Sequence, residues 1–171
     1  MKLSSRAEKF VLHWGEMGTR WGINRTVAQI HALLYLSPRP LNAEEISETL
    51  SVARSNVSNS LRELQNWGLA KVVHVLGDRR DHFETLKEVW DMFQIILRER
   101  KRREVDPTLK VLRDALAEKP VNEDDKLSQQ KMQSPLDFFE TTSALYDQLG
   151  DFSPGTLKQL AGLARKMGGS R

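Results

Sequence analysis

The sequence predicts a mainly α-helical protein that contains one β-hairpin. Capping residues followed by apolar residues at helical spacing recur along the chain, from Ser5 to Ser153. The period changes at AKVVHVL (residues 70–76), where β-branched residues cluster as they do in strands. GDRR (77–80) is then expected to form the turn and DHFET (81–85) the returning strand. Helices are therefore expected on both sides of a two-stranded hairpin.

The composition narrows the class of protein. None of the 171 residues is cysteine, which excludes disulfides and thiolate chemistry and favours a reducing compartment. The longest apolar run, LLYL (33–36), is far short of the roughly 20 residues of a membrane span, and the N-terminus has no secretory signal. We therefore expect a cytoplasmic protein that does not act at a membrane. The net charge of +3 is compatible with a nucleic-acid partner without requiring one.

Four helices are expected before the hairpin. The first carries an apolar stripe of Phe10, Trp14, Met17 and Trp21 and ends at Gly22. The second stops before Pro38, the short third ends near Leu50, and the fourth runs to Trp67. They begin, in order, at a capping box of Ser5 with Glu8, at Asn24, at a capping box of Asn42 with Glu45, and after the tight connection Ser51-Val52-Ala53.

The helices expected after the hairpin have comparable signals. A capping box, Thr85 to Glu88, opens a long helix that runs into RERKRRE (98–104). PVNEDDK (120–126) is expected to be a polar linker. Three further helices are expected to begin with proline at their first position, at Asp106-Pro107, Ser134-Pro135 and Ser153-Pro154.

The fourth helix has two faces of different chemistry. Its inner stripe consists of Ala53, Val57, Leu61 and Leu64, and its outer face of Arg54, Ser55, Ser58, Asn59, Arg62 and Asn66. Asn and Arg present paired hydrogen-bonding groups to base edges, and Ser lets the backbone approach, whereas a solvated helix face usually mixes Glu and Lys. A short helix, a tight turn, such a helix and a hairpin describe a winged helix-turn-helix. An exposed polar helix in a bundle is the alternative.

The hairpin carries two adjacent arginines, Arg79 and Arg80, between Asp78 and Asp81. A hairpin that follows a recognition helix brings its tip to the adjacent minor groove, where narrow A·T tracts concentrate negative potential. One arginine would reach into the groove, while Asp78 holds the other and stiffens the hairpin. A solvated hairpin with incidental charges is the alternative.

The stretch LNAEEISETLSVARSNVSNSLRELQNWGLAKVVHVLGDRRDHFE resembles MarR-type regulators, and within that superfamily the betaine-synthesis-regulator (GbsR) branch. The resemblance covers residues 24–84. It implies a dimeric winged helix in which Arg79 or Arg80 enters the minor groove and Asp78 pairs with Arg80. It assigns base reading to Ser55, Asn56, Ser58 and Asn59 and phosphate contacts to Arg54 and Arg62. Ala53 departs from the serine that relatives often carry, which removes a helix cap.

Other chemistry lacks support in the sequence. Of the four histidines only His74 and His82 could meet, across the hairpin, and they form no complete metal site. No catalytic constellation or phosphate-binding loop is present, so we expect no enzyme and no cofactor. RERKRRE is either a DNA-backbone contact or a solvated helix face. The aromatic residues Trp14, Trp21, Tyr35 and Trp90 could hold a choline-like ligand, of the kind the resemblance implies, but at helical spacing they are more typical of a core or dimer interface.

These observations predict a sequence-specific DNA-binding transcriptional regulator, expected to be a repressor, that acts as a homodimer on a near-palindromic operator in double-stranded DNA. The expected parts are an amphipathic N-terminal helix (1–22), a winged helix-turn-helix (23–85) and a helical dimerisation region (86–171). A small-molecule effector, if one exists, is expected between the helical region and the DNA-reading module. The alternative is a winged helix that binds another protein without reading DNA.

Overall fold

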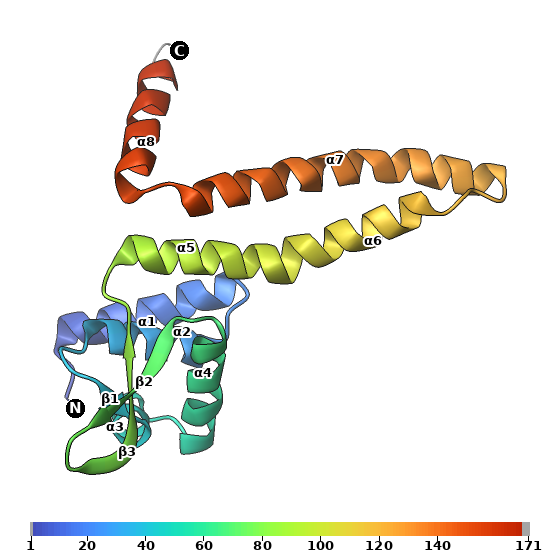
Figure 1. Cartoon of the computed structure of the whole chain (residues 1–171). Coiled ribbons are helices and arrows are strands. Elements are labelled where there is room, and N and C mark those ends of the chain that lie inside the picture. The colour runs from blue at the N-terminus through green and yellow to red at the C-terminus, as the bar shows by residue number, and fades with distance from the viewer. Residues whose placement is uncertain (1, 169–171) are drawn as a thin grey trace. The chain divides into compact units, whose positions relative to one another are not determined.

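The computed structural model describes residues 2–168, with side chains through Lys166. It divides into two compact units, unit 1 (Met1–Met92) and unit 2 (Phe93–Arg171), each of which is considered by itself (Figure 1). The prediction of a mainly α-helical fold with a β-hairpin is confirmed.

Unit 1 combines helices with a small antiparallel sheet. The sheet order is β1-β3-β2, and β1 was not predicted because its two residues, Leu41 and Asn42, pair only with Phe83 and His82 of β3. The elements of unit 1 are α1 (Ser5–Arg20), α2 (Arg25–Leu36), β1 (Leu41–Asn42), α3 (Ala43–Leu50), α4 (Arg54–Asn66), β2 (Ala70–Val75), β3 (Asp78–Thr85) and the first residues of α5 (Val89–Arg100).

The core of unit 1 is centred on α2. Ile30, Leu33 and Leu34 are at most 1% exposed, and α1, α3 and α4 all contact this helix. Helix α1 approaches α2 closely at Gly18, where a Cβ atom would lie 2.5 Å from that of Ala28. The face of α1 that packs on α2 is therefore narrow and small, and consists of Val11, Gly15 and Gly18.

The aromatic residues of the apolar stripe predicted for the first helix do not lie on the buried face of α1. Phe10 stacks on Trp14 with ring centroids 5.4 Å apart, and Trp14 meets Trp21 edge to face at 6.2 Å. Phe10 and Trp14 are only half-buried, and Trp21 is 51% exposed. Phe10 and Trp14 stack because residues four apart are neighbours on a helix surface, and Trp21, directly after the helix, lies two turns further along the same side.

The predicted helix starts divide into confirmed and wrong ones. Asn24 caps α2, and Asn42 with Glu45 forms the capping box of α3. The first helix is capped by Ser4 rather than Ser5. The capping box predicted at Thr85 is wrong, because Thr85 ends β3 and its hydroxyl donates to the Leu69 carbonyl.

The predicted hairpin turn lies too far along the chain. The strands pair up to Val75 and Asp78, so Leu76 and Gly77 form the connection and Asp78, Arg79 and Arg80 already belong to β3. Gly77 has φ of +84°, a conformation that side-chain-bearing residues rarely adopt. The arginines therefore have the alternating orientation of strand residues.

Unit 2 consists of helices. They are the remainder of α5, a π-helical turn η1 (Lys101–Val105), α6 (Asp106–Ala117), α7 (Glu123–Asp151) and α8 (Pro154–Gly168). The helix predicted to begin at Asp106-Pro107 is present as α6, but Asp106 is its first residue rather than its cap, and α6 continues directly from α5 through η1. The Asp106 N–H donates to the Lys101 carbonyl, five residues back, so the wide turn directly precedes Pro107. Pro107 thereby lies in the first turn of α6, where its missing N–H is tolerated.

Helix α7 is longer than the sequence predicts. Asn122 caps it, so the acidic residues expected in a linker form its first turn, where they oppose the positive end of the helix dipole. Pro135 lies inside α7 rather than at a helix start. Pro135 and Lys131 are both exposed, so solvent can satisfy the Lys131 carbonyl that loses its helical partner. The start at Ser153-Pro154 is confirmed, with the Ser153 hydroxyl accepting from the Thr156 N–H at 3.1 Å.

A buried histidine and a lysine lie close to the carboxyl-terminal end of α2. The Lys87 ammonium donates to the carbonyls of Leu34, Tyr35 and Ser37 at 2.7, 3.0 and 2.9 Å, which caps this helix end. His31 is 6% exposed, and its Nε2 has no hydrogen-bond partner among the described residues. Burial, and secondarily the charge of Lys87, lower the pKa of His31 from 6.5 to about 4.

This histidine predicts an acid-sensitive fold. The folded protein keeps His31 neutral while the unfolded chain takes up a proton below pH 6.5, so the contribution is complete above pH 6.5 and is lost as the pH falls towards 4. The pKa shift corresponds to about 2 kcal/mol lost between pH 7 and pH 5. Urea titrations should show this loss in the wild type and a correspondingly smaller loss in His31→Gln. The exposed His13→Gln variant is the control; a pH dependence that is unchanged in His31→Gln would contradict the assignment.

Candidate nucleic-acid interface

Local hydrogen bonds hold both ends of α3, the short helix that leads into α4. The Asn42 side chain accepts from the N–H groups of Glu44 and Glu45 at 3.1 and 3.0 Å, and Glu45 accepts from the Asn42 N–H. After α3, Ser51 has φ of +53° and the Ser47 hydroxyl donates to the Val52 carbonyl at 2.7 Å. These bonds fix the point at which α4 begins.

Helix α4 is divided into a buried and an exposed face. Val57, Leu61 and Leu64 are at most 2% exposed, and Ser60 is also buried. Every residue of α4 to which the sequence assigns a DNA contact is exposed: Arg54, Ser55, Asn56, Ser58, Asn59 and Arg62. This face contains no carboxylate from residue 54 to residue 62 and carries the two positive charges of its arginines.

The β2–β3 hairpin holds one of its two arginines in a fork. Arg80 Nε donates to Asp78 Oδ1 at 2.9 Å, and Arg80 Nη2 donates to Asp78 Oδ2 at 2.6 Å. The remaining terminal nitrogen, Arg80 Nη1, contacts Oε2 of Glu44 in α3 at 3.2 Å. The structure therefore contains the pair of Asp78 and Arg80 that the resemblance implies.

The charges around this fork stabilise one another. The Arg80 side chain, hydrogen-bonded to Asp78, holds the pKa of that carboxyl well below its usual range. His82, which is buried, places Nε2 3.5 Å from Asp78 Oδ2, and its Nδ1 lies 3.0 Å from the Arg80 carbonyl. Arg79 is exposed and has no hydrogen-bond or ion-pair partner within residues 2–168. The hairpin therefore presents one neutralised and one available guanidinium.

The two surfaces lie at the same end of unit 1. In Figure 1 the hairpin tip and the amino-terminal end of α4 both lie at the lower edge of this unit. The tip residue Leu76 is fully exposed. The amino-terminal end of α4 and the tip of the arginine-bearing hairpin therefore lie at one end of unit 1, which is compatible with reading of adjacent grooves.

Sequence reasoning missed two members of the site. Glu44 is one of several acids in the third helix, and nothing in the sequence pairs it with a residue 36 positions away. His82 appeared only as a metal candidate, but it lies in the Asp78–Arg80 network. No group of three or more His, Asp or Glu residues in the described part of the chain is arranged to hold a metal ion.

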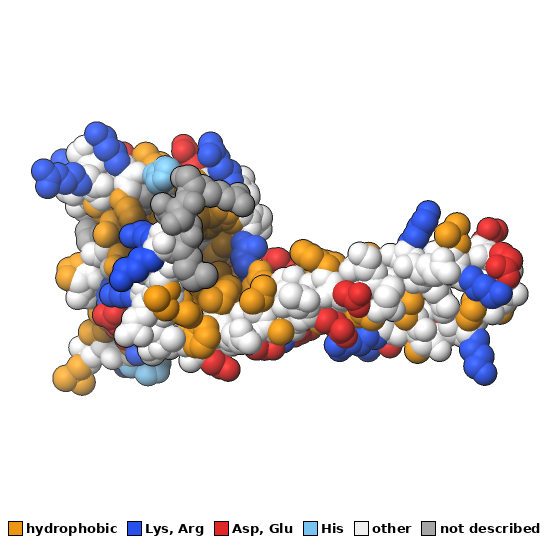
Figure 2. Space-filling model, turned by 90° about the horizontal axis from the view of Figure 1, so that it is seen from above, with side chains coloured by type: hydrophobic (Ala, Val, Ile, Leu, Met, Phe, Trp, Pro, Cys, Tyr) orange, Lys and Arg blue, Asp and Glu red, His pale blue; other side chains and the backbone are white. Residues whose placement is uncertain are grey.

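The basic segment RERKRRE is largely paired within unit 2. Glu99 accepts from Arg102 at 2.7 Å and from Arg103 at 3.1 Å, Arg100 lies 3.4 Å from Glu104, and Lys101 bridges Asp106 and Asp147 at 3.2 Å each. Figure 2 shows basic and acidic side chains mixed along the α6–α7 hairpin. This pairing favours the interpretation of the segment as a solvated helix face.

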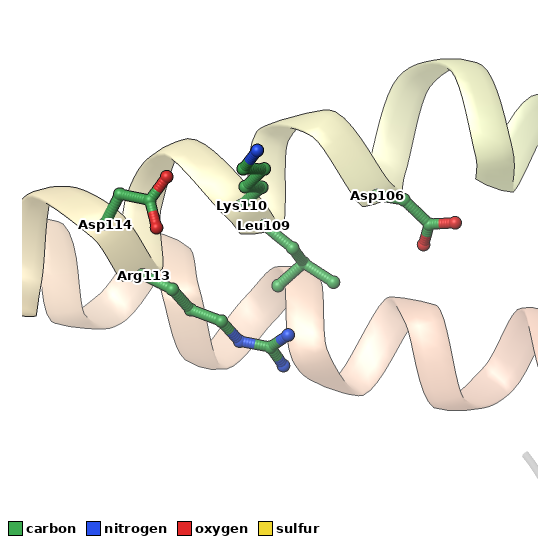
Figure 3. Close-up of a pocket in the computed structure, with 5 residues that line it drawn as sticks. All are labelled: Asp106, Leu109, Lys110, Arg113 and Asp114. Atoms are coloured by element: carbon green, nitrogen blue, oxygen red, sulfur yellow. The ribbon is translucent and has the colours of Figure 1, made fainter.

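A pocket of about 260 Å³ lies along α6 in the same unit (Figure 3). Its lining residues are Asp106, Leu109, Lys110, Arg113 and Asp114. Arg113 pairs with Glu140 of α7 at 2.8 Å and Asp106 with Lys101, so two of its charges are already engaged. The one apolar lining residue, Leu109, is buried in the α6–α7 contact, which leaves little apolar surface for a ligand.

The segment with this geometry matches a known family. The model of the MarR family covers residues 21–81, from the residue after α1 to the fourth residue of β3. This segment is therefore similar to MarR-family domains over 61 of the 171 residues of the chain.

Two curated proteins of Bacillus subtilis (strain 168) are similar to part of this chain. "Putative HTH-type transcriptional regulator YvaV" is 23% identical over 86 residues, which are 50% of this chain and 49% of that protein. "HTH-type transcriptional repressor OpcR" is 23% identical over 73 residues, which are 43% of this chain and 40% of that protein. The aligned parts thus cover at most about half the length of these relatives.

The fold extends beyond the MarR-family segment. A crystal structure of a transcriptional regulator matches 85% of this chain and 96% of that chain with a TM-score of 0.65 at 20% identity. It shows that the winged-helix fold predicted from the sequence is correct. Among residues 2–168, no helix combines the length and the apolar character that crossing a membrane requires.

The start of α4 offers a test of local stability. Ala53 occupies the N-cap with extended backbone angles, φ −60° and ψ 140°, and provides no side-chain hydrogen bond. Ala53→Ser should supply the missing acceptor and raise the free energy of unfolding by about 1 kcal/mol. Urea denaturation measures this change, with Ala53→Val as the control that cannot cap. Equal stability of the Ser and Val variants would show that the amino-terminal amides of α4 need no cap.

Proposed function

We propose that this protein is a sequence-specific DNA-binding transcriptional regulator. The observation that carries the proposal is the exposed, carboxylate-free face of α4 at the same end of unit 1 as the arginine-bearing hairpin. The similarity to MarR-family domains supports it, as do the names of the two curated relatives, which describe transcriptional regulators.

In this proposal α4 is the recognition helix and enters the major groove. Ser55, Asn56, Ser58 and Asn59 read base edges, because amide and hydroxyl groups match the donor and acceptor pattern exposed there. Arg54 and Arg62 contact phosphates on either side of the groove. The buried stripe of α4 fixes the helix on α2, so these side chains are presented on a rigid element.

The β2–β3 hairpin is the wing, and one of its arginines enters the adjacent minor groove. Arg79 is available for this role in the DNA-free protein, because Asp78 holds Arg80 rather than Arg79. Narrow A·T-rich minor grooves attract guanidinium groups strongly. We therefore propose that the operator contains A·T-rich flanks.

The regulator acts as a homodimer in this proposal. Its parts are the N-terminal helix (1–22), the winged helix-turn-helix (23–85) and the helical region (86–171), which forms the dimer. Exposed apolar side chains on α7 and α8, such as Phe138, Leu145 and Leu163, are suited to that role. Membership of the GbsR branch rests on the resemblance of the α3–β3 sequence, and action as a repressor is supported by the name of OpcR.

Selection of bound sequences from a random duplex pool tests this function. We expect one enriched motif, near-palindromic with half-sites one helical turn apart, about 34 Å, because two recognition helices would occupy successive major grooves. Sedimentation of the complex should give two chains per duplex. Failure to enrich any motif would favour a winged helix that binds another protein instead.

Two neighbouring side chains of α4 should affect the affinity for DNA in different ways. Asn59→Ala should weaken binding to the selected duplex by about 1–3 kcal/mol and change binding to random DNA little, because it removes a base contact. Arg62→Ala is the matched control, three residues further along α4. It should weaken binding to both duplexes and reduce the salt slope by about one unit. Fluorescence anisotropy at several salt concentrations measures both. Equal losses for Asn59→Ala on the two duplexes would refute base reading.

A further inference from the structure

The wing arginine Arg80 is shared between carboxylates from two different elements. Asp78, its neighbour in β3, occupies Nε and Nη2, and Glu44 in α3 occupies Nη1. The side chains of Arg80 and Glu44 are 52% and 50% exposed, whereas that of Asp78 is 24% exposed. The Glu44 contact is thus single, longer and more accessible to solvent than the forked contact with Asp78.

The Glu44 carboxylate that contacts Arg80 takes no part in the cap of α3. The capping box of α3 uses the carboxylate of Glu45, and Glu45 also pairs with Arg39. Glu44 takes part in the cap only through its backbone N–H, which donates to Asn42. Its carboxylate is therefore free to be replaced at Arg80 without loss of the helix start.

We propose that Glu44 is an intramolecular competitor of DNA for Arg80, so that Arg80 is a second wing contact that is masked in the DNA-free protein. This inference rests on the proposed function. A phosphate or groove edge that approaches the wing would replace the Glu44 carboxylate at Nη1, while Asp78 keeps the guanidinium oriented. Asp78 stays paired with the guanidinium during the exchange, so Arg80 is not desolvated without an anionic partner at any stage.

The size of the effect follows from the exposure of the pair. Exposed ion pairs of this kind change equilibria by about two- to five-fold, and less as salt is added. Binding of DNA has to overcome the Glu44 contact first, so Glu44 should lower affinity by that factor wherever Arg80 is used. Removal of the competitor should raise affinity, and the gain should require Arg80.

A double-mutant cycle on the full chain tests this inference. Affinity for the selected duplex is measured by fluorescence anisotropy at low salt for wild type, Glu44→Gln, Arg80→Ala and the double variant. We expect Glu44→Gln to bind about two- to five-fold more tightly in the wild-type background and to have no such effect in the Arg80→Ala background. Glu48→Gln, an exposed residue of the same helix, measures the effect of losing one negative charge from α3.

A second variant distinguishes the effect of side-chain length from that of charge. Glu44→Asp keeps the negative charge but shortens the side chain by one methylene, which breaks a contact that is already 3.2 Å long. It should raise affinity in an Arg80-dependent manner although the charge is unchanged. The variant also keeps the acidic residue in the first turn of α3, so helix stability is preserved.

The outcomes are distinct. Equal gains with and without Arg80, or the same gain for Glu48→Gln, would mean general charge repulsion and overturn the inference. A loss of affinity in Glu44→Gln would overturn it as well, because Glu44 would then position the wing. If the wild type selects no sequence at all, the proposed function itself fails; selection by the wild type without coupling in the cycle removes only the role of Glu44.

Discussion

The packing of α4 on α2 is the constraint from which the chemistry of unit 1 follows. Val57, Leu61 and Leu64 are buried against the core, and they recur at the spacing that places them on one side of a helix. Burial of this stripe forces Ser55, Asn59 and Arg62 to the opposite side. Packing of the core therefore determines which side chains of α4 are exposed to a partner.

The arginines of the chain differ in whether a carboxylate of the same chain lies close enough to pair with them. In unit 2, Arg102 and Arg103 both pair with Glu99, so a carboxylate on the same helix offsets part of their charge. In unit 1, Arg54 and Arg62 lie on a helix face without carboxylates, and the pairing of Arg80 with Asp78 leaves Arg79 exposed beside it. Placement relative to acidic residues, rather than the modest net charge, distinguishes the surface suited to a polyanion.

The sequence predicted the elements of unit 1 well because their signals are local. Asn24, Asn42 and Gly68 mark helix ends through bonds and angles that depend on adjacent residues alone. The exposure of the predicted residues of α4 followed from helical periodicity in the same way. Strand β1 could not be predicted, because two residues are too short for a pattern and pair with residues about forty positions away.

Predictions from proline and capping motifs were less reliable in the later helices. Pro135 resembles a helix start but lies inside α7, whereas α6 does begin at Asp106 but continues from α5 through η1. Thr85 has capping-box spacing with Glu88, yet the pairing of β3 with β2 extends through it. The contact of Glu44 with Arg80 depends on the tertiary arrangement of α3 and the hairpin, and no local sequence pattern predicts it.

The π-helical turn η1 has a geometrical consequence for the helix that contains it. An α-helix turns by about 100° per residue, so one additional residue in a turn rotates the rest of the helix by that angle relative to an uninterrupted spiral. The apolar residues Leu109, Leu112 and Leu116 consequently point in a direction that a helical wheel drawn from α5 would misplace. The phase of α6 is set at residues 101–105, and the side of the helix that meets α7 is set with it.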